Sequence, residues 1–290
     1  MVTPGMLDNP SVKKWLGGVE PAWTLLSQDS FHALRKPPSP TEGSIRLANN
    51  LTPDEIHQSA VARNALMLLH AATDAPGLKM TATGNLSRSV VAQMFDLFTW
   101  PDLDKGMVIR MNKVINEPDF FPLYFVRHVI ESSNLLRRHK GFLRASPAGR
   151  KMLDASNQRA LQAVLFHVSM WHIDLGYLGR GLLQGWPQSD IGIVLWSLSV
   201  AANDWQTSER LTRLCTLPVN GVVDAQGDVG AMAMEARLLR PLLWFGLLEY
   251  KCDDSEERPF DRRHLYRKTA LFDRFITFDV ALERPAIATH

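Results

Sequence analysis

The chain has 290 residues, of which 46% are hydrophobic and 21% are charged, and its formal net charge is +2. These values are ordinary for a globular protein and leave room for two modest domains. No apolar run approaches the roughly 20 residues that a membrane span needs, and the N-terminus carries no basic stretch before an apolar core, so we expect a cytoplasmic protein with no membrane partner.

The first 48 residues are rich in proline and glycine and show little helical period. Pro37, Pro38 and Pro40 follow one another closely, and proline interrupts both helices and central strands. We therefore expect residues 1–48 to form a loosely packed, proline-rich arm with one short helix around residues 21–34.

Regular structure is predicted to begin at Thr52, in the segment Thr-Pro-Asp-Glu. This segment supplies a hydroxyl cap, a proline where no amide donor is needed, and a glutamate that can bond back to the cap. Amphipathic helices are then predicted over residues 61–73 and 87–98, separated by a short strand near 77–81. Residues 99–120 read as an insertion or long loop.

A helix beginning near Pro122 leads into a predicted hairpin at residues 135–146. Helix, short strand, helix, loop, helix and hairpin is the order of elements in a winged helix, a small domain that binds mostly nucleic acid or protein. We therefore predict a first winged-helix-like domain over residues 49–151. An apolar, aromatic block over 152–188 is predicted to be a helical connector.

The same pattern of apolar helix, hairpin and Ser/Thr-led helix start occurs a second time, with its hairpin at 247–269. It is preceded by predicted helices at 191–202, 207–215 and 232–245. Residues 189–290 are therefore predicted to form a second winged-helix-like domain. The expected fold class is mainly α with short β-hairpins, as tandem winged-helix units joined by a helical block.

Four sequence blocks resemble a group of bacterial proteins of unassigned function. They are Asn-Leu-Thr-Pro-Asp-Glu from Asn50, Ala-Arg-Asn-Ala-Leu from Ala62, Leu-Lys-Met-Thr-Ala-Thr-Gly-Asn-Leu-Ser-Arg from Leu78, and Tyr-Arg-Lys-Thr-Ala-Leu-Phe-Asp-Arg-Phe from Tyr266. The resemblance covers roughly residues 48–280 and implies relatives that form C-terminal halves of larger, plasmid-associated proteins. It implies no catalytic residues. Winged-helix regulators of bacteria are similar at the level of the fold alone, which does not fix function.

The sequence contains none of the common nucleotide-binding, nucleophile-elbow or zinc-protease motifs, so we expect no enzyme and no cofactor. Cys215 and Cys252 form no Cys-x-x-Cys pair. His167 and His172 are five residues apart, which on a continuous helix turns them about 140° away from each other. We therefore expect no metal site.

Basic residues gather in the first hairpin, and we predict that they contact the phosphates of double-stranded DNA. Arg127, in the helix before the hairpin, is a candidate to pair with guanine. Asn134, between that helix and the hairpin, is a candidate to pair with adenine. The earlier turn and helix add Lys79 and Arg88. The hairpin itself contributes Arg137, Arg138, His139, Lys140 and Arg144.

The second hairpin has an acidic tip, formed by Asp253, Asp254, Glu256 and Glu257, which phosphate would repel. We expect this domain to pack against the middle helices, a protein partner or a second copy of the chain. The alternative function is thus a protein-interaction or assembly module in which neither hairpin binds nucleic acid. Exposure of the first hairpin's cations beside Arg127 and Lys79 favours DNA, whereas pairing with the protein's own carboxylates favours the assembly module.

Overall fold

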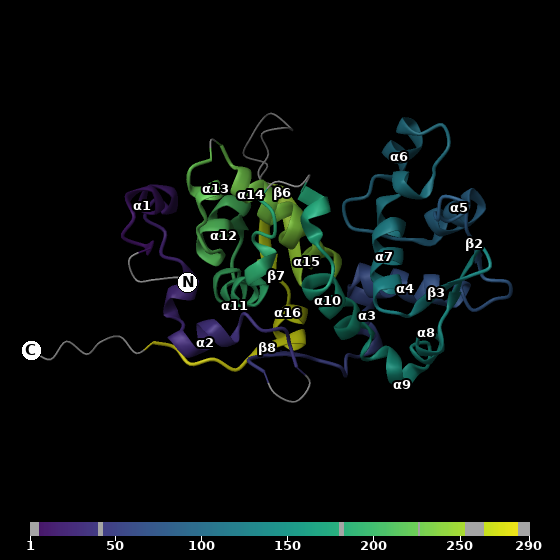
Figure 1. Ribbon diagram of the computed structural model, residues 1–290, viewed down its shortest axis with the longest axis horizontal. Helices are drawn as coiled ribbons and strands as arrows, with labels where there is room; N and C mark the ends of the chain where they lie inside the picture. The colour runs from purple at the N-terminus through teal and green to yellow at the C-terminus, as the bar shows by residue number, and fades with distance from the viewer. Residues whose placement is uncertain (1–5, 40–42, 180–182, 226, 253–263, 284–290) are drawn as a thin grey trace, which may run out of the picture. The chain divides into compact units, whose positions relative to one another are not determined.

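The computed structural model describes residues 6–39, 43–179, 183–225, 227–252 and 264–283. The chain divides into two compact units (Figure 1), unit 1 being Met1–Leu47 with Asp174–His290 and unit 2 being Ala48–Ile173. Helices predominate, and the strands form small antiparallel sheets, which confirms the predicted fold class of mainly α with short hairpins. Within these ranges, every helix is too short or too polar to cross a membrane.

Unit 2 contains a group of helices and a three-stranded sheet of order β2-β4-β3. In chain order its elements are α3 (Pro53–Gln58), α4 (Ala60–Ala71), β2 (Leu78–Lys79), α5 (Arg88–Leu97), α6 (Lys105–Met111), the 3₁₀ turn η3 (Glu117–Asp119), α7 (Phe121–Ser132), β3 (Leu136–His139), β4 (Phe142–Ala145), α8 (Pro147–Lys151), α9 (Ala155–Gln158) and α10 (Leu161–Trp171).

Local sequence explains where the first helices of unit 2 begin. The Thr52 hydroxyl accepts a hydrogen bond from the Glu55 amide, and the Glu55 carboxylate accepts one from the Thr52 amide, which completes the predicted capping box. Ser59 then ends α3 and caps α4, so a break separates two helices with different faces. The apolar face of α4 is buried around Leu68 and Leu69.

The predicted hairpin at 135–146 is present as β3 and β4, joined at Lys140 and Gly141. Both turn residues have positive φ, 47° and 79°, as a two-residue type I′ turn requires. Leu143 and Ala145 of β4 are buried, so one face of the hairpin is fixed to the core. The opposite face is therefore open to solvent.

Unit 1 contains a second three-stranded sheet, of order β5-β7-β6, and a two-stranded sheet, β1-β8. Its elements are α1 (Pro10–Leu16), η2 (Ala22–Leu25), α2 (Gln28–Ala33), β1 (Ile45–Leu47), η4 (Leu175–Gly179), η5 (Gln188–Asp190), α11 (Ile191–Ala201), β5 (Gln206–Thr207), α12 (Ser208–Cys215), α13 (Asn220–Val223), α14 (Val229–Met234), the π-helical turn η6 (Glu235–Leu239), α15 (Arg240–Trp244), β6 (Leu248–Cys252), β7 (His264–Lys268), α16 (Ala270–Phe275) and β8 (Ile276–Phe278).

The predicted hairpin at 247–269 is confirmed by the antiparallel pairing of β6 with β7. Thr207 caps α12, as the sequence predicted, by accepting a hydrogen bond from the Arg210 amide. The predicted helix at 232–245 is made of three consecutive helical segments, α14, η6 and α15. The acidic tip, residues 253–257, lies outside the described residues.

The two hairpins are held by equivalent hydrogen bonds. In unit 2 the Ser146 hydroxyl donates to the Asn134 carbonyl at 2.8 Å, and in unit 1 the Thr269 hydroxyl donates to the Gly246 carbonyl at 2.7 Å. Asn134 and Gly246 both have left-handed backbones, with φ of 57° and 73°. The repeat seen in the sequence is therefore a repeat of local structure.

A second pair of bonds connects each sheet to the helix that opens its unit's repeat. The Ala145 amide donates to the Ala72 carbonyl at the end of α4, and the Lys268 amide donates to the Ala202 carbonyl at the end of α11. In both units the central strand of the sheet is the last of the three in the chain. The two units thus share one strand topology.

The first 47 residues form part of unit 1, so the expectation of a loosely packed arm is corrected. Leu34 and Ile45 are buried, and β1 pairs with β8 from Ile45↔Phe278 to Leu47↔Ile276. Gly192 on α11 permits the contact, because a Cβ there would lie 2.0 Å from the Leu34 carbonyl oxygen. The interactions are with residues far along the chain, which local proline content does not reveal.

Two further expectations differ from the structure. Residues 99–120 contain α6 and η3 and are not a simple loop. The block 152–188, expected to be a connector of packed helices, has one long helix, α10, and is divided between the units after Ile173. Between Asp174 and the start of α11, the described residues form only short 3₁₀ turns.

Candidate functional site

Five basic side chains on unit 2 are exposed on or next to the β2-β4-β3 sheet, and we call them the cationic rim. Four of them have no polar side-chain partner in the part of the chain that the structure describes. The fifth, Arg88, donates to Asn116 Oδ1 at 3.1 Å, which does not neutralise its charge. The members are Lys79, Arg88, Arg137, His139 and Lys140.

Strand pairing brings the members of the cationic rim together from distant parts of the sequence. Lys79 on β2 is in register with Phe142 on β4, and the Met80 amide donates to the Gly141 carbonyl at the hairpin turn, at 2.9 Å. The Ser87 amide donates to the Lys79 carbonyl at 2.8 Å, directly before Arg88 begins α5. The hairpin, β2 and the start of α5 therefore form one neighbourhood.

Like charges face each other across the hairpin. Arg137 on β3 is in register with Arg144 on β4, an arrangement that destabilises an antiparallel pair when nothing offsets it. Arg144 is partly satisfied, because its Nε donates to the Pro76 carbonyl at 2.6 Å. The charge of this pair is available to an anion outside the chain.

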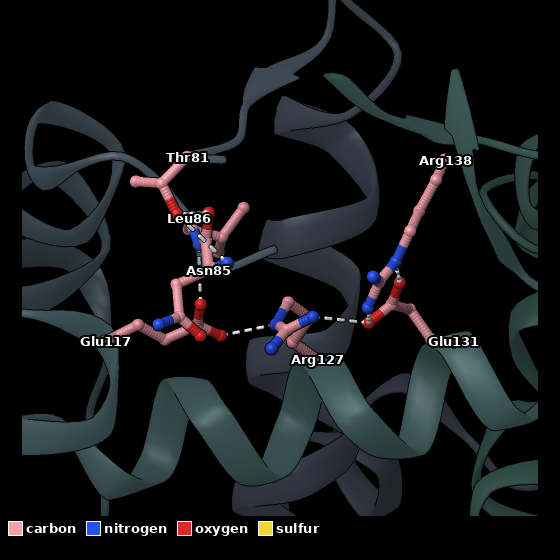
Figure 2. Close-up of polar contacts among 7 residues, drawn as sticks. All are labelled: Thr81, Asn85, Leu86, Glu117, Arg127, Glu131 and Arg138. Carbon is pink, nitrogen blue, oxygen red and sulfur yellow. Dashed lines mark hydrogen bonds and ion pairs between the residues drawn. The ribbon is translucent and has the colours of Figure 1, made fainter. Parts of the chain in front are cut away.

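A chain of ion pairs connects η3, α7 and the hairpin of unit 2 (Figure 2). Arg127 of α7 bonds to Glu117 of η3 and, at 2.5 Å, to Glu131 one helical turn later. The Glu131 carboxylate also accepts from Arg138 Nε at 2.8 Å, across to β3. Glu117 is fully buried, and its second oxygen accepts from the Leu86 amide at 2.6 Å.

This chain fixes the turn between β2 and α5 against α7 and the hairpin. Within the turn, the Thr81 amide donates to the Asn85 carbonyl at 2.7 Å, and the Asn85 amide donates back to the Thr81 hydroxyl at 3.2 Å. Gly84 has a φ of 83°, and a Cβ added there would lie 3.3 Å from Arg138 Nη1. The turn and the hairpin are therefore in close approach.

Arg127 is not available to a base, which corrects its predicted role. Its side chain is buried and engaged by both Glu117 and Glu131. Burying a guanidinium requires charge compensation of this kind. Helical period placed Arg127 on the polar face of α7, but it did not show that a carboxylate from a preceding turn covers that face.

Asn134 and Arg138 also have structural roles. Asn134 takes the left-handed backbone that Gly246 takes in unit 1, and asparagine tolerates this conformation better than most residues. Arg138 is exposed, but its hydrogen bond to Glu131 raises the pKa of the guanidinium above its usual value. Its charge is thus shared with the protein's own carboxylate.

The remaining surface of α7 offers few groups to a partner. Most of the helix is buried, including Leu123, Val126 and Ile130. Tyr124 and His128, which are partly exposed, stack on each other with ring centroids 6.3 Å apart. Desolvation by burial and the charge of Arg127 lower the pKa of His128, so this face of α7 is mostly uncharged at neutral pH.

A pocket of about 580 Å³ lies between the start of α5 and η3. Lys79, Ser87 and Arg88 line one side, and Asn116 and Glu117 line the other. The Ser87 side chain makes no bond to the first amides of α5, although it occupies the capping position. The positive end of the helix therefore faces the pocket without a side-chain cap.

Sequence reasoning missed Glu117 and the compensating role of Glu131. Two local signals were present: Arg127 and Glu131 are spaced i,i+4, and Asn116 with Asp119 forms a capping box around Glu117. Neither signal predicts the bond between Glu117 and Arg127, which depends on how η3 meets α7. No cluster of three or more metal-ligating side chains occurs within the described ranges.

Two comparisons with known proteins match the region that contains this site. Residues 57–159 match a family model described as the Y4jL N-terminal domain. The chain is also similar to a protein of Sinorhizobium fredii named "Uncharacterized protein y4jL", with 33% identity over 109 residues. These matches support kinship with an uncharacterised bacterial family.

The matched region is narrower than the resemblance noted in the sequence. The alignment covers 38% of this chain and 49% of the Sinorhizobium fredii protein, so the chain spans about half the length of the relative. The block from Tyr266 lies outside the match, and the description as an N-terminal domain differs from the C-terminal position that the resemblance implied. No solved structure matches the chain.

Proposed function

We propose that unit 2 binds double-stranded nucleic acid, mainly through its phosphate backbone, as part of a regulatory-type protein. The cationic rim is the binding surface in this proposal. Lys79, Arg137 and Lys140 carry permanent charges, His139 a titratable one, and Arg88 extends the surface to the start of α5. Each phosphate neutralised by such a cation releases condensed counterions, which favours binding.

The observation that carries the proposal is that, among the described residues, the carboxylates of the ion-pair chain in unit 2 are paired, whereas the cations of the rim are not. Glu117 and Glu131, the carboxylates next to α7 and the hairpin in the ion-pair chain, are already paired with Arg127 and Arg138. The rim cations, in contrast, have no carboxylate partner among the described residues. An arrangement that neutralises its acids and leaves its bases exposed favours an anionic ligand.

The proposal includes the winged-helix architecture for both units. The order α4, β2, α5, α7, β3, β4, with β4 central in the sheet, supports it for unit 2. The order α11, β5, α12, α14 to α15, β6, β7, with β7 central, supports it for unit 1. In such a domain the hairpin is the wing, and a wing lies along the sugar-phosphate backbone.

Weak discrimination between sequences is expected. Base reading requires exposed donors and acceptors that reach a groove, and Arg127 of α7 is buried and paired. Phosphate contacts fix position without reading sequence. Unit 2 should therefore bind duplexes of different sequence with similar affinity.

Fluorescence anisotropy with labelled duplexes tests the proposal. Wild-type protein should bind several unrelated duplexes, and the double variant Arg137→Glu, Lys140→Glu should bind all of them more weakly by the same factor. A matched control, Lys13→Glu with Arg46→Glu, makes the same change in charge on unit 1, where both residues are exposed. The control should retain wild-type affinity.

Two results would contradict the proposal. One is an absence of salt-dependent binding by wild-type protein to duplex or single-stranded nucleic acid at moderate ionic strength. The other is an equal loss of affinity in the control variant, which would mean that net charge and not the cationic rim determines affinity.

Exposed apolar side chains on α6 favour the second candidate, a protein-interaction module. Met107, Ile109 and Met111 are 53%, 58% and 76% exposed, and no residue of α6 is buried. Figure 1 shows α6 at the end of unit 2 away from α8 and α9. Met107 and Met111 are one helical turn apart and share a face of α6, and contiguous exposed apolar side chains commonly mark protein contact sites.

Substitution separates the two functions. Changing Met107, Ile109 and Met111 to serine should leave nucleic-acid binding unchanged if the rim acts alone. If instead the wild type binds no nucleic acid, self-associates in sedimentation experiments, and no longer does so in the serine variant, the interaction module is the better account.

A further inference from the structure

The end of α10 brings two histidines of unit 2 into contact. A continuous helix would turn His167 and His172 about 140° apart, because each residue adds about 100°. The helix ends at Trp171, however, and the φ of His172 is −119°, which differs from the usual helical value of about −63°. As a result the two Nε2 atoms lie 3.0 Å apart.

The rings are held in this arrangement by their neighbours. The His167 ring stacks on the Trp171 ring, with centroids 5.7 Å apart and planes 21° apart. Trp171 in turn meets the edge of Phe166, at 6.1 Å. His167 is half-buried, whereas His172 is exposed, so the pair is accessible from solvent on one side.

The separation of the two nitrogens fits a pair of ligands on one metal ion. Histidine nitrogens bind Zn²⁺ at about 2.0–2.1 Å, and two such ligands 3.0 Å apart subtend an angle of about 95° at the metal. This angle lies between the cis angle of square-planar sites and the tetrahedral angle. A neutral imidazole carries a lone pair on one ring nitrogen, which it can donate to such an ion.

We propose that His167 and His172 form a two-histidine binding site for a divalent d-block metal ion, with Zn²⁺, Ni²⁺ and Cu²⁺ as the class. Imidazole nitrogen is a preferred ligand of these ions. No third histidine, cysteine or carboxylate completes the cluster within the described ranges. Water or a group outside the described residues therefore fills the other positions, and we expect reversible binding.

Calorimetric titration of the full chain with Ni²⁺ and with Zn²⁺ tests the site. Wild-type protein should take up one ion per chain, and His167→Gln and His172→Gln should each weaken binding by about tenfold or more, since even the removal of a group that only supports a ligand costs 10–100-fold. His70→Gln removes an exposed histidine at the end of α4 in the same unit. This control should bind like the wild type.

A spectroscopic measurement keeps the test independent of the folding of the variants. Electron paramagnetic resonance of wild-type protein with one equivalent of Cu²⁺ should show coupling to two imidazole nitrogens. Coupling to one nitrogen would overturn the proposal, as would wild-type affinity in both glutamine variants. Absence of saturable binding would overturn it too, leaving the two rings as a hydrogen-bonded pair in which one donates to the other.

Discussion

The two sheets of this protein share a topology but use their cations in different ways. In unit 1, two hairpin cations among the described residues are paired with carboxylates: Arg267 with Glu249 at 2.6 Å, and Lys268 with Asp273 at 2.9 Å. In unit 2 the corresponding hairpin leaves Arg137 and Lys140 without carboxylate partners among the described residues. Strand topology therefore does not determine what a hairpin can bind, and the placement of carboxylates does.

The two hairpins also differ in the contacts of their cations with aromatic rings. Two hairpin cations of unit 1 lie over the ring of Trp205, with Lys251 Nζ 4.8 Å and Arg267 Cζ 4.6 Å from the ring centroid. Such contacts hold cationic groups against the protein. The hairpin of unit 2 has no equivalent cation–aromatic contact in the part that the structure describes, so its cations remain open to solvent.

The largest expected effect concerns the buried ion pair of unit 2. Glu117 is fully buried beside Arg127, and Glu117→Gln should lower the free energy of unfolding by about 3–5 kcal/mol, because it leaves a buried guanidinium short of compensation. In unit 1, Glu249 is 44% exposed, and Glu249→Gln should cost about 0.2–1 kcal/mol. Chemical denaturation measures both, and equal destabilisation would break the comparison.

A smaller effect is expected where the first 47 residues meet α11. In Gly192→Ala the new Cβ would lie 2.0 Å from the Leu34 carbonyl oxygen, and we expect the free energy of unfolding to fall by about 1–3 kcal/mol. Gly149→Ala in unit 2 should behave similarly, since its Cβ would lie 2.0 Å from the Leu135 carbonyl oxygen. Thermal denaturation shows whether each substitution stabilises or destabilises the protein.

The sign of the change in the free energy of unfolding in Gly192→Ala shows whether the N-terminal segment is packed against α11 or is a loose arm. If residues 1–47 were a loose arm, alanine in α11 would stabilise the helix by about 1 kcal/mol relative to glycine. Gly106→Ala, on the exposed helix α6, provides the matched control without a backbone clash. Stabilisation by Gly192→Ala would therefore contradict the packing of the N-terminal segment against α11.

The smallest effect is a difference in thiol reactivity within unit 1. Cys215 is buried, and desolvation raises the pKa of its thiol far above the usual range, whereas Cys252 is exposed. Reaction with a disulfide reagent at pH 8 should modify Cys252 quickly and Cys215 only on unfolding. Rapid modification of Cys215 in Gly192→Ala would show that unit 1 opens when the N-terminal segment is displaced.

The sequence predicted those features that depend on neighbouring residues. The capping box at Thr52 and the cap at Thr207 are set by side chains within three positions of each other. The two hairpins were predicted because short apolar segments, turn residues and a Ser/Thr start follow one another in both copies. Such features can be predicted because the residues that form their hydrogen bonds and turns are neighbours in the sequence.

The sequence could not predict contacts between distant residues. The role of Arg127 depends on Glu117, which a loop brings back to α7. The packing of Leu34 depends on Gly192, and the pairing of β1 depends on β8 at the other end of the chain. His167 and His172 were expected to point apart because the prediction assumed a continuous helix, whereas α10 ends at Trp171, between them.

The salt dependence of nucleic-acid binding tests the central claim most directly. The logarithm of affinity should fall linearly with the logarithm of salt concentration for wild-type protein. The slope should become shallower by about 0.9 for each phosphate that Arg137→Glu or Lys140→Glu leaves without its cation. Lys251→Glu, in the hairpin of unit 1, should leave the slope unchanged. Equal slopes for the wild type and all three variants would contradict the claim that the cationic rim of unit 2 binds the phosphate backbone.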